Sequence, residues 1–435
     1  VPFSIASDTM DIRFITRHSF LPILLLIVCV PLSAQIMNQL PIRASFIQPH
    51  LFTQWDDSQW QKEFTYLKEA GMDMLIFMHT VLSSEQGRIS FYPSQLEGVK
   101  GSENDLMENC LRNARLAGFK VIIGLNFDDC WWKPETWSKE WLTEQMELGN
   151  RVAAELIERY KSRYPDTMYG WYWVWEIIDS YCKDPLIRNQ LVSALNINLD
   201  FLHTQTPDMP ILLSPFMNST QSTKESCAEV WQYILSHGHF KDGDIFAPQD
   251  CVGSGFLKEE EAPQWFEALS RVIPATPKIQ FWGNVELFDQ RFWTTATPAR
   301  LKRQIDALRP YVSNFISFAY SHYYSPRSKK PIIHRAYVHY MKTGTLPDVP
   351  IPPAVNSLRR EIDAGKQYLT WKAPVDKSAI MGYRVYRDGV LIDDVQPKHE
   401  EEYYRSHEIG EEKGVYVVVA YNVCGEEAPP VSVVW

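Results

Sequence analysis

Two glutamates, Glu176 and Glu286, each close a strongly apolar run of the sequence. A carboxylate in such surroundings is costly unless it has a partner or a chemical task. Two opposed carboxyl groups suit the cleavage of a glycosidic bond, because one can donate a proton to the leaving oxygen while the other attacks or stabilises the developing cationic carbon. The aromatic neighbours of Glu176, namely Tyr172, Trp173 and Trp175, should raise its pKa, which suits the proton donor. Glu286 would then be the nucleophile or base.

Over residues 44–325, short apolar runs alternate with longer amphipathic ones. The eight short runs are typical of parallel strands covered on both faces: Ala44–Phe52, Met72–Thr80, Lys120–Asp128, Tyr169–Ile177, Pro210–Phe216, Gly243–Asp250, Lys278–Leu287 and Asn314–Tyr324. Segments with helical periodicity separate them, among them Leu106–Ala117, Trp141–Tyr164, Leu186–His203, Pro263–Val272 and Pro298–Leu308, and Ile332–Lys342 would be the last helix. Gly71 and Gly118 follow two of these helices as stop signals.

Eight successive strand–helix units predict an α/β fold, a (β/α)8 TIM barrel over residues 35–345. An open, doubly wound sheet is the alternative, but no Gly-x-Gly-x-x-Gly motif follows any of the strands.

In a TIM barrel the functional residues gather at the carboxyl ends of the strands, which supply the remaining candidates. The polar candidates for substrate binding are Gln48, His79, Asn126, Asp128, Asp250, Asn284 and His322. The aromatic candidates, which could stack on sugar rings, are Trp131, Trp175, Trp282 and Tyr323. Structural roles are the alternative. The aspartates could cap a helix or form a loop turn, and the histidines could be buried core residues with their hydrogen bonds satisfied. The aromatic rings could simply cover the end of the barrel core, and the glutamates could form buried ion pairs.

Glutamates that end strands four and seven, here Glu176 and Glu286, are similar to the catalytic pair of the retaining glycoside hydrolases of clan A. The resemblance extends over about residues 40–345, at the level of strand ends, and the layout also looks like a poorly characterised bacterial family of glycosidase-type barrels. It implies that Glu176 is the acid/base and Glu286 the nucleophile. Clan A members usually have Asn directly before the strand-four glutamate, whereas this chain has Trp175. This departure keeps an inverting mechanism open, with Glu176 and Asp250, or Asp128 and Glu286, as the pair.

The composition changes beyond the barrel. Residues 346–353 contain four prolines and predict a stiff, extended linker. Residues 354–435 then show short alternating strands, and Arg387-Asp388-Gly389 is a hairpin signal. The series Leu369-x-Trp371-x-Ala373-Pro374, Gly382-Tyr383-Arg384-Val385-Tyr386 and Tyr416-x-Val418-x-Ala420-Tyr421-Asn422 resembles a fibronectin type III domain. That resemblance implies a small all-β sandwich that serves as a spacer or docking module.

The first 34 residues have the pattern of a secretory signal peptide. Arg13 and Arg17 precede the apolar run Leu21–Leu32, and Leu32-Ser33-Ala34 supplies a cleavage site. Met10 is a plausible start, with residues 1–9 as an upstream extension, and a buried or membrane-anchoring helix is the alternative. We therefore expect export to the periplasm, cell surface or medium, and no transmembrane segment in the mature chain.

Composition limits the partners. The 435 residues carry a net charge of −10 and are 13% aromatic. An acidic chain repels a phosphate backbone, so no nucleic acid is expected, whereas aromatic rings suit a carbohydrate. We expect a monomer that acts on a poly- or oligosaccharide, with no cofactor and no metal.

Three other functional classes compete with a glycosidase. A non-catalytic carbohydrate-binding barrel would use the same rings, with carboxylates that only accept hydrogen bonds from hydroxyls. A metal-dependent hydrolase would need His-x-His at an early strand end, where His50 stands alone; His237-Gly238-His239 lies away from the expected mouth. A serine hydrolase would need a Gly-x-Ser-x-Gly motif, which the sequence lacks.

Overall fold

The computed structural model describes residues 42–435. The expected signal peptide over residues 1–34 and the first residues of the expected barrel domain, 35–41, lie outside the described residues.

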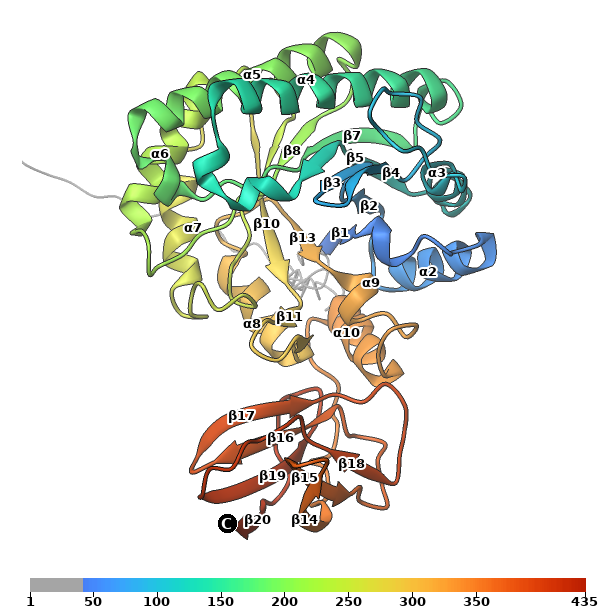
Figure 1. Ribbon diagram of the computed structural model, residues 1–435, viewed down its shortest axis with the longest axis vertical. Helices are drawn as coiled ribbons and strands as arrows, with labels where there is room; N and C mark the ends of the chain where they lie inside the picture. The colour runs from blue at the N-terminus through green and yellow to red at the C-terminus, as the bar shows by residue number, and fades with distance from the viewer. Residues whose placement is uncertain (1–41) are drawn as a thin grey trace, which may run out of the picture. The chain divides into compact units, whose positions relative to one another are not determined.

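Eight parallel strands close into a barrel (Figure 1). They are β1 (Ile42–Ile47), β2 (Met74–Phe77), β5 (Lys120–Gly124), β7 (Met168–Trp173), β8 (Ile211–Leu213), β9 (Ile245–Phe246), β10 (Gln280–Glu286) and β13 (Asn314–Phe318). Around the barrel the order is β1-β13-β10-β9-β8-β7-β5-β2, so every strand neighbours the next one along the chain. The strands are mostly apolar because helices cover one face and barrel-filling side chains the other; all four residues of β2 are buried. The eight predicted strands are confirmed.

The helices that connect the strands are α2 (Asp57–Glu69), α3 (Leu106–Ala117), α4 (Lys139–Leu156), α5 (Pro185–Gln205), α6 (Lys224–His237), α7 (Ala262–Ser270), α8 (Pro298–Leu308) and α10 (Pro331–Thr343). Their ends follow local chemistry: the Asp56 carboxylate caps α2 by accepting from the Gln59 backbone N–H, and Gly118 ends α3 in the left-handed conformation at φ 77°. The predicted helix Trp141–Tyr164 instead ends as α4 at Leu156 and continues as a π turn, η4 (Ile157–Lys161).

All eight strands are shorter than predicted, and at three of them other local structure begins at the carboxyl end. Beyond β1 the chain forms a 3-10 turn, η1 (Pro49–Leu51), and beyond β13 it forms α9 (Tyr320–Tyr323). Beyond β5 it leaves the barrel: β6 (Asn126–Asp128) joins β3 (Val81–Ser84) and β4 (Gly87–Ser90) in a separate sheet with order β4-β3-β6.

Further short elements follow other strand ends. They are η2 (Asp129–Trp132), η3 (Pro134–Thr136), η5 (Asp179–Lys183) and a two-stranded hairpin of β11 (Phe288–Asp289) and β12 (Thr294–Thr295). These insertions form the walls around the carboxyl ends of the barrel strands.

An all-β unit with two antiparallel sheets follows the barrel. One sheet has the order β14-β15-β18, made of β14 (Asn356–Asp363), β15 (Lys366–Lys372) and β18 (Tyr403–Arg405). The other has the order β17-β16-β19-β20, made of β17 (Val390–Val395), β16 (Gly382–Arg387), β19 (Val415–Tyr421) and β20 (Val431–Val434). Asp388 and Gly389 form the predicted hairpin turn, with φ of 49° and 82°.

The fold is therefore the predicted TIM barrel followed by a small β-sandwich. Its membership of the fibronectin type III family remains a prediction. Within residues 42–435, no helix is both long and apolar enough to cross a membrane.

Candidate active site

A cleft of about 530 Å³ opens at the carboxyl ends of the barrel strands. Every barrel strand except β2 contributes to it through its last residue or the loop that follows. The lining residues are Gln48, Trp132, Glu176, Ile178, Tyr181, Phe216, Asn218, Gln221, Gln249, Ser254, Phe256, Glu286, Phe288, Gln290, Trp293, Phe318 and Tyr323. Both glutamates singled out by the sequence therefore face the same cavity.

Glu176 lies three residues beyond the end of β7 and is partly accessible from the cleft. Trp131 fixes the backbone here, because its indole Nε1–H donates to the Glu176 carbonyl at 2.9 Å. Burial among protein atoms raises the pKa of the Glu176 carboxyl to about 7, against a smaller lowering by a hydrogen bond from the Gln249 side chain. A carboxyl group of this kind keeps its proton near neutral pH and can donate it.

Glu286 is the last residue of β10 and is 2% exposed. The backbone N–H of Ser254 donates to its Oε2 at 2.6 Å. This approach needs glycine at position 253, because a Cβ there would lie 3.0 Å from Oε2 and 2.4 Å from the Phe288 carbonyl oxygen. The loop after β9 is thus shaped to hold the Glu286 carboxyl.

Asp250 is fully buried and supports Glu286 instead of lining the cleft. Its Oδ1 accepts from the Glu286 backbone N–H at 3.2 Å, and its Oδ2 accepts from Gln304 Nε2 at 2.5 Å. Burial, and then the neighbouring Asp250 charge, raise the pKa of Glu286, while the Arg300 guanidinium opposes the rise. The predicted substrate-binding role of Asp250 is corrected: it tunes the carboxyl that faces the cleft.

The rest of the lining is aromatic and amide-rich. Trp132, Tyr181 and Trp293 are 53%, 39% and 64% exposed, which is unusual for large rings and typical of a binding surface. Five amide side chains join them: Gln48, Asn218, Gln221, Gln249 and Gln290. Among these lining residues there is no lysine, arginine or histidine, so the two glutamates are the only acidic or basic side chains on the cleft wall.

Of the predicted site residues, Gln48, Glu176, Glu286 and Tyr323 line the cleft. The other polar candidates lie behind it. Asn126 is buried and donates to the Gln145 carbonyl at 3.2 Å; Asn284 is buried and donates to Ser214 Oγ at 3.0 Å. Asp128 caps η2, because its carboxylate accepts a hydrogen bond from the Cys130 N–H at 2.9 Å. Of the two roles expected for Asp128, the structure therefore shows the helix cap.

His79 and His322 also lie outside the cleft lining. The buried His79 ring stacks on His50 with ring centroids 5.8 Å apart, and burial lowers its pKa to about 3. His322 stacks on Phe318 at 6.4 Å, and burial lowers its pKa to about 4. Both rings are therefore neutral packing elements around the cleft floor.

Three predicted stacking rings are buried instead. Trp131 and Trp175 are 1% and 3% exposed and pack against each other at 5.3 Å. Trp175 also contacts Trp141 at the start of α4, so its ring faces the helix layer. Trp282 pairs with Asn314, the first residue of β13, which places it toward the amino-terminal end of the barrel.

Sequence reasoning missed most of the wall, because these residues lie past the strand ends. Tyr181 is in η5, Phe216 and Asn218 follow β8, and Trp293 is at the end of the β11–β12 turn. Trp132, which directly follows the predicted Trp131, faces the cleft, whereas Trp131 is buried.

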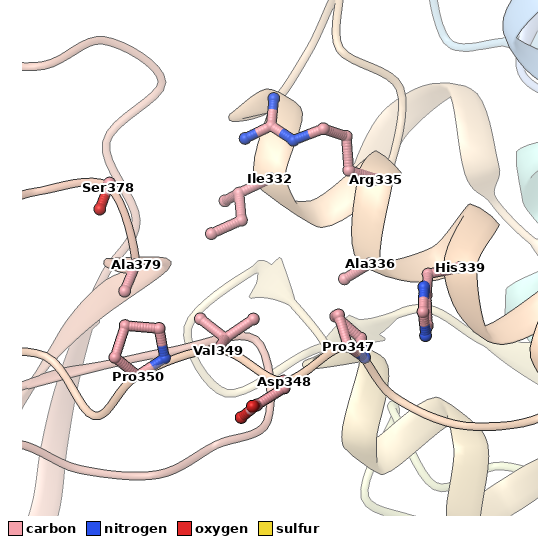
Figure 2. A pocket seen from close by; sticks show the side chains of 10 residues that line it. All are labelled: Ile332, Arg335, Ala336, His339, Pro347, Asp348, Val349, Pro350, Ser378 and Ala379. Atoms are coloured by element: carbon pink, nitrogen blue, oxygen red, sulfur yellow. The ribbon is translucent and has the colours of Figure 1, made fainter.

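A second hollow, of about 350 Å³, lies beside α10 and the linker (Figure 2). Its lining runs from α10 through residues 347–350 to Ser378 and Ala379. Arg335, His339 and Asp348 are the only ionisable side chains among its lining residues, so it offers no pair of carboxyls. The cleft at the strand ends is therefore the candidate active site.

Solved structures share the barrel fold. A protein from Bacteroides thetaiotaomicron, described as a candidate alpha-L-fucosidase, has a TM-score of 0.59 and 21% identity, covering 70% of this chain and 94% of that one. A family 39 glycoside hydrolase from Bacteroides cellulosilyticus has a TM-score of 0.46 and 12% identity, covering 91% of this chain and 81% of that one. At 21% identity the first likeness concerns the fold alone, and no argument is based on the second.

No curated protein matches the sequence. A family model described as "Domain of unknown function (DUF4434)" matches residues 42–330, which span the barrel from β1 to the start of α10. The chain therefore belongs to the DUF4434 family.

Proposed function

We propose that the barrel is a glycoside hydrolase that cleaves O-glycosidic bonds of a poly- or oligosaccharide. The observation that carries the proposal is that Glu176 and Glu286, from non-adjacent strands β7 and β10, face one open, aromatic-lined cleft. Paired carboxyl groups are the usual machinery for this reaction. The barrel fold shared with solved structures is compatible with it.

In the proposed mechanism Glu176 donates its proton to the glycosidic oxygen as the bond to the anomeric carbon breaks. The Glu286 carboxylate attacks that carbon to give a covalent glycosyl–enzyme. Glu176, now ionised, then takes a proton from water, whose oxygen displaces Glu286 and releases the sugar with retained configuration. Burial raises the pKa of Glu286 as well as that of Glu176, so the assignment of Glu176 as the first proton donor rests on its position after the fourth barrel strand.

The lining also supports an uncharged substrate. Five amide groups can exchange hydrogen bonds with sugar hydroxyls, and exposed rings can stack on sugar faces. A uronic acid or sulfate group would find no cation among the lining residues of 42–435 and would approach two carboxyls. We therefore propose a neutral saccharide as the substrate.

We also propose that the protein is exported and monomeric. The signal-peptide pattern of residues 1–34 supports export. Amino-terminal sequencing of the protein from its native cell envelope or medium would find Gln35 at the start of the chain if export and cleavage occur.

A non-catalytic carbohydrate-binding barrel is the second candidate, and one observation favours it. The Asp250 charge and burial raise the pKa of Glu286, and a protonated carboxyl can bond to a hydroxyl but cannot attack carbon.

The test is hydrolysis of a panel of neutral aryl glycosides and oligosaccharides, with the first-formed anomer identified by NMR. Release of the anomer with the substrate's configuration supports the retaining mechanism. Release of the opposite anomer would make Glu286 the base for water. Binding without any release across the panel would favour the second candidate.

A further inference from the structure

The β11–β12 hairpin forms one wall of the cleft. Phe288, Gln290 and Trp293 from this hairpin line the cavity. Trp293 stacks on Phe288 with centroids 6.1 Å apart and planes 13° apart, and Phe288 stacks on Tyr323 at 5.5 Å. Three rings thus form a continuous stack, and its outermost member, Trp293, is 64% exposed.

Trp293 adopts a backbone conformation that its residue type disfavours, with φ 53°. A hairpin with two residues in each strand is too short to hold such a turn by itself. Contacts outside the hairpin must therefore fix the position of the ring.

On the β11 side these contacts come from the barrel. The Gln290 N–H donates to the Gly253 carbonyl at 2.8 Å, and Arg300 Nη2 donates to the Phe288 carbonyl at 2.5 Å. On the β12 side, Thr295 Oγ1 donates to the Tyr323 carbonyl at 3.0 Å. The backbone groups of Thr295 still need a partner beyond the barrel.

That partner comes from the β-sandwich. The Gln396 side chain, just after β17, accepts from the Thr295 N–H and donates to the Thr295 carbonyl, both at 2.8 Å. Thr294 Oγ1 donates to Asp394 Oδ2 at 2.9 Å. The Tyr421 hydroxyl fixes Asp394 in turn by donating to Oδ1 at 2.7 Å. Asp394 is 8% exposed, so little water competes for these bonds.

We propose that the β-sandwich is a working part of the saccharide site: Gln396 and Asp394 are positioning residues that hold the β12 strand, and through it Trp293, as a stacking platform for a sugar ring. The Gln396 amide acts as a neighbouring strand would, because it satisfies both backbone groups of Thr295. This inference rests on the proposed saccharide substrate. It also gives the sandwich a role beyond that of a spacer or docking module.

The binding test uses the full chain with Glu286→Gln, so that turnover does not consume the ligand, and a neutral oligosaccharide that the wild-type protein binds. Trp293→Ala should raise the Kd by about tenfold, the scale of a lost aromatic stack. Gln396→Ala should raise the Kd several-fold. In a protein that already carries Trp293→Ala, the Gln396→Ala substitution should not raise the Kd further, because Gln396 acts on the saccharide only through the Trp293 ring. Gln367→Ala, which removes a glutamine on β15, is the matched control and should leave the Kd unchanged.

A second readout needs no ligand. Hydrogen exchange of the amides in residues 288–295 should quicken in Gln396→Ala, with exchange in β7 and α4 unchanged. The Gln367→Ala variant should match the unaltered chain over 288–295.

The inference is overturned if Gln396→Ala leaves the exchange of residues 288–295 unchanged, or if Trp293→Ala leaves the Kd unchanged. Failure of the proposed function would look different. In that case the unaltered chain would bind oligosaccharide through Trp293 and release no sugar from it.

Discussion

The backbone N–H of Glu286 donates to the carboxylate of Asp250 at 3.2 Å, and both residues are buried, with Glu286 in the cleft lining and Asp250 outside it. Burial raises the pKa of both carboxyl groups, and the Asp250 charge raises the pKa of Glu286 further. Asp250 has three N–H donors, from Gln304, Val252 and Glu286 itself. These donors favour the ionised form of Asp250 and leave the shared proton on Glu286.

Replacement of Asp250 by Asn should therefore shift the pH profile of the reaction. Loss of the neighbouring charge lowers the pKa of Glu286, which must be ionised to attack. The acidic limb of kcat/KM against pH should therefore move to lower pH and the rate at the pH optimum should rise, because more of the enzyme then carries an ionised Glu286 together with a protonated Glu176. Steady-state kinetics across pH 4 to 9 on one neutral substrate measure both limbs.

Asp128→Asn is the control for this experiment, because Asp128 caps η2 away from the cleft lining. A fall in the optimum rate of Asp250→Asn would exchange the two roles, with Glu286 as the acid.

Replacement of Glu176 by Gln should stabilise the protein above neutral pH. The folded state raises the Glu176 pKa from 4.5 to about 7. Between these values the folded chain binds more protons than the unfolded chain, so the wild-type free energy of unfolding falls as pH rises. Glutamine does not titrate, and the variant should gain up to about 3 kcal/mol over the wild type by pH 8 and little at pH 4.

Urea unfolding at several pH values gives this difference directly. Glu147→Gln, on the exposed face of α4, should follow the wild type throughout. An equal stability of Glu176→Gln and wild type at pH 8 would contradict a raised pKa at position 176.

Charged sugars should be poor substrates. Because none of the described residues that line the cleft is cationic, kcat/KM for a uronide should fall at least tenfold, roughly 1.4 kcal/mol, below that for the matching neutral glycoside. Gln290→Arg places a guanidinium on the β11–β12 turn and should recover part of the loss. Gln264→Arg, exposed on α7, adds the same charge elsewhere and should recover none. Equal rates on both substrates in the wild type would refute a neutral specificity.

The barrel could be predicted from the sequence because the same pattern, a short apolar run followed by a segment with helical periodicity, is repeated along the chain. Eight apolar runs separated by helical periodicity leave few alternatives, and both glutamates follow from the rule that barrel strands end at the site. The strand lengths could not be predicted as well. Asn126 and Asp128 continue an apolar run, yet β6 leaves the barrel to pair with β3.

The cleft wall was harder to predict, because side-chain direction beyond a strand end depends on loop geometry. Trp175 and Glu176 are adjacent in the sequence, but the Trp175 ring packs toward α4 whereas the Glu176 side chain faces the cleft. Trp293 depends on the sandwich, more than 100 residues later in the chain, through the bond of Thr295 to Gln396. No local pattern in the sequence encodes such a contact.

The most direct test of the account is the turnover of one neutral substrate by wild type, Glu176→Gln and Glu286→Gln. Each variant keeps the size and hydrogen-bonding reach of the side chain and removes its ability to transfer a proton or attack carbon. We predict a loss in kcat of about 10²–10⁴-fold for each, with the oligosaccharide Kd nearly unchanged. Glu260→Gln, an exposed glutamate outside the cleft, should retain full activity. Wild-type turnover in either cleft variant would remove that glutamate from the mechanism and contradict the paired-carboxyl account.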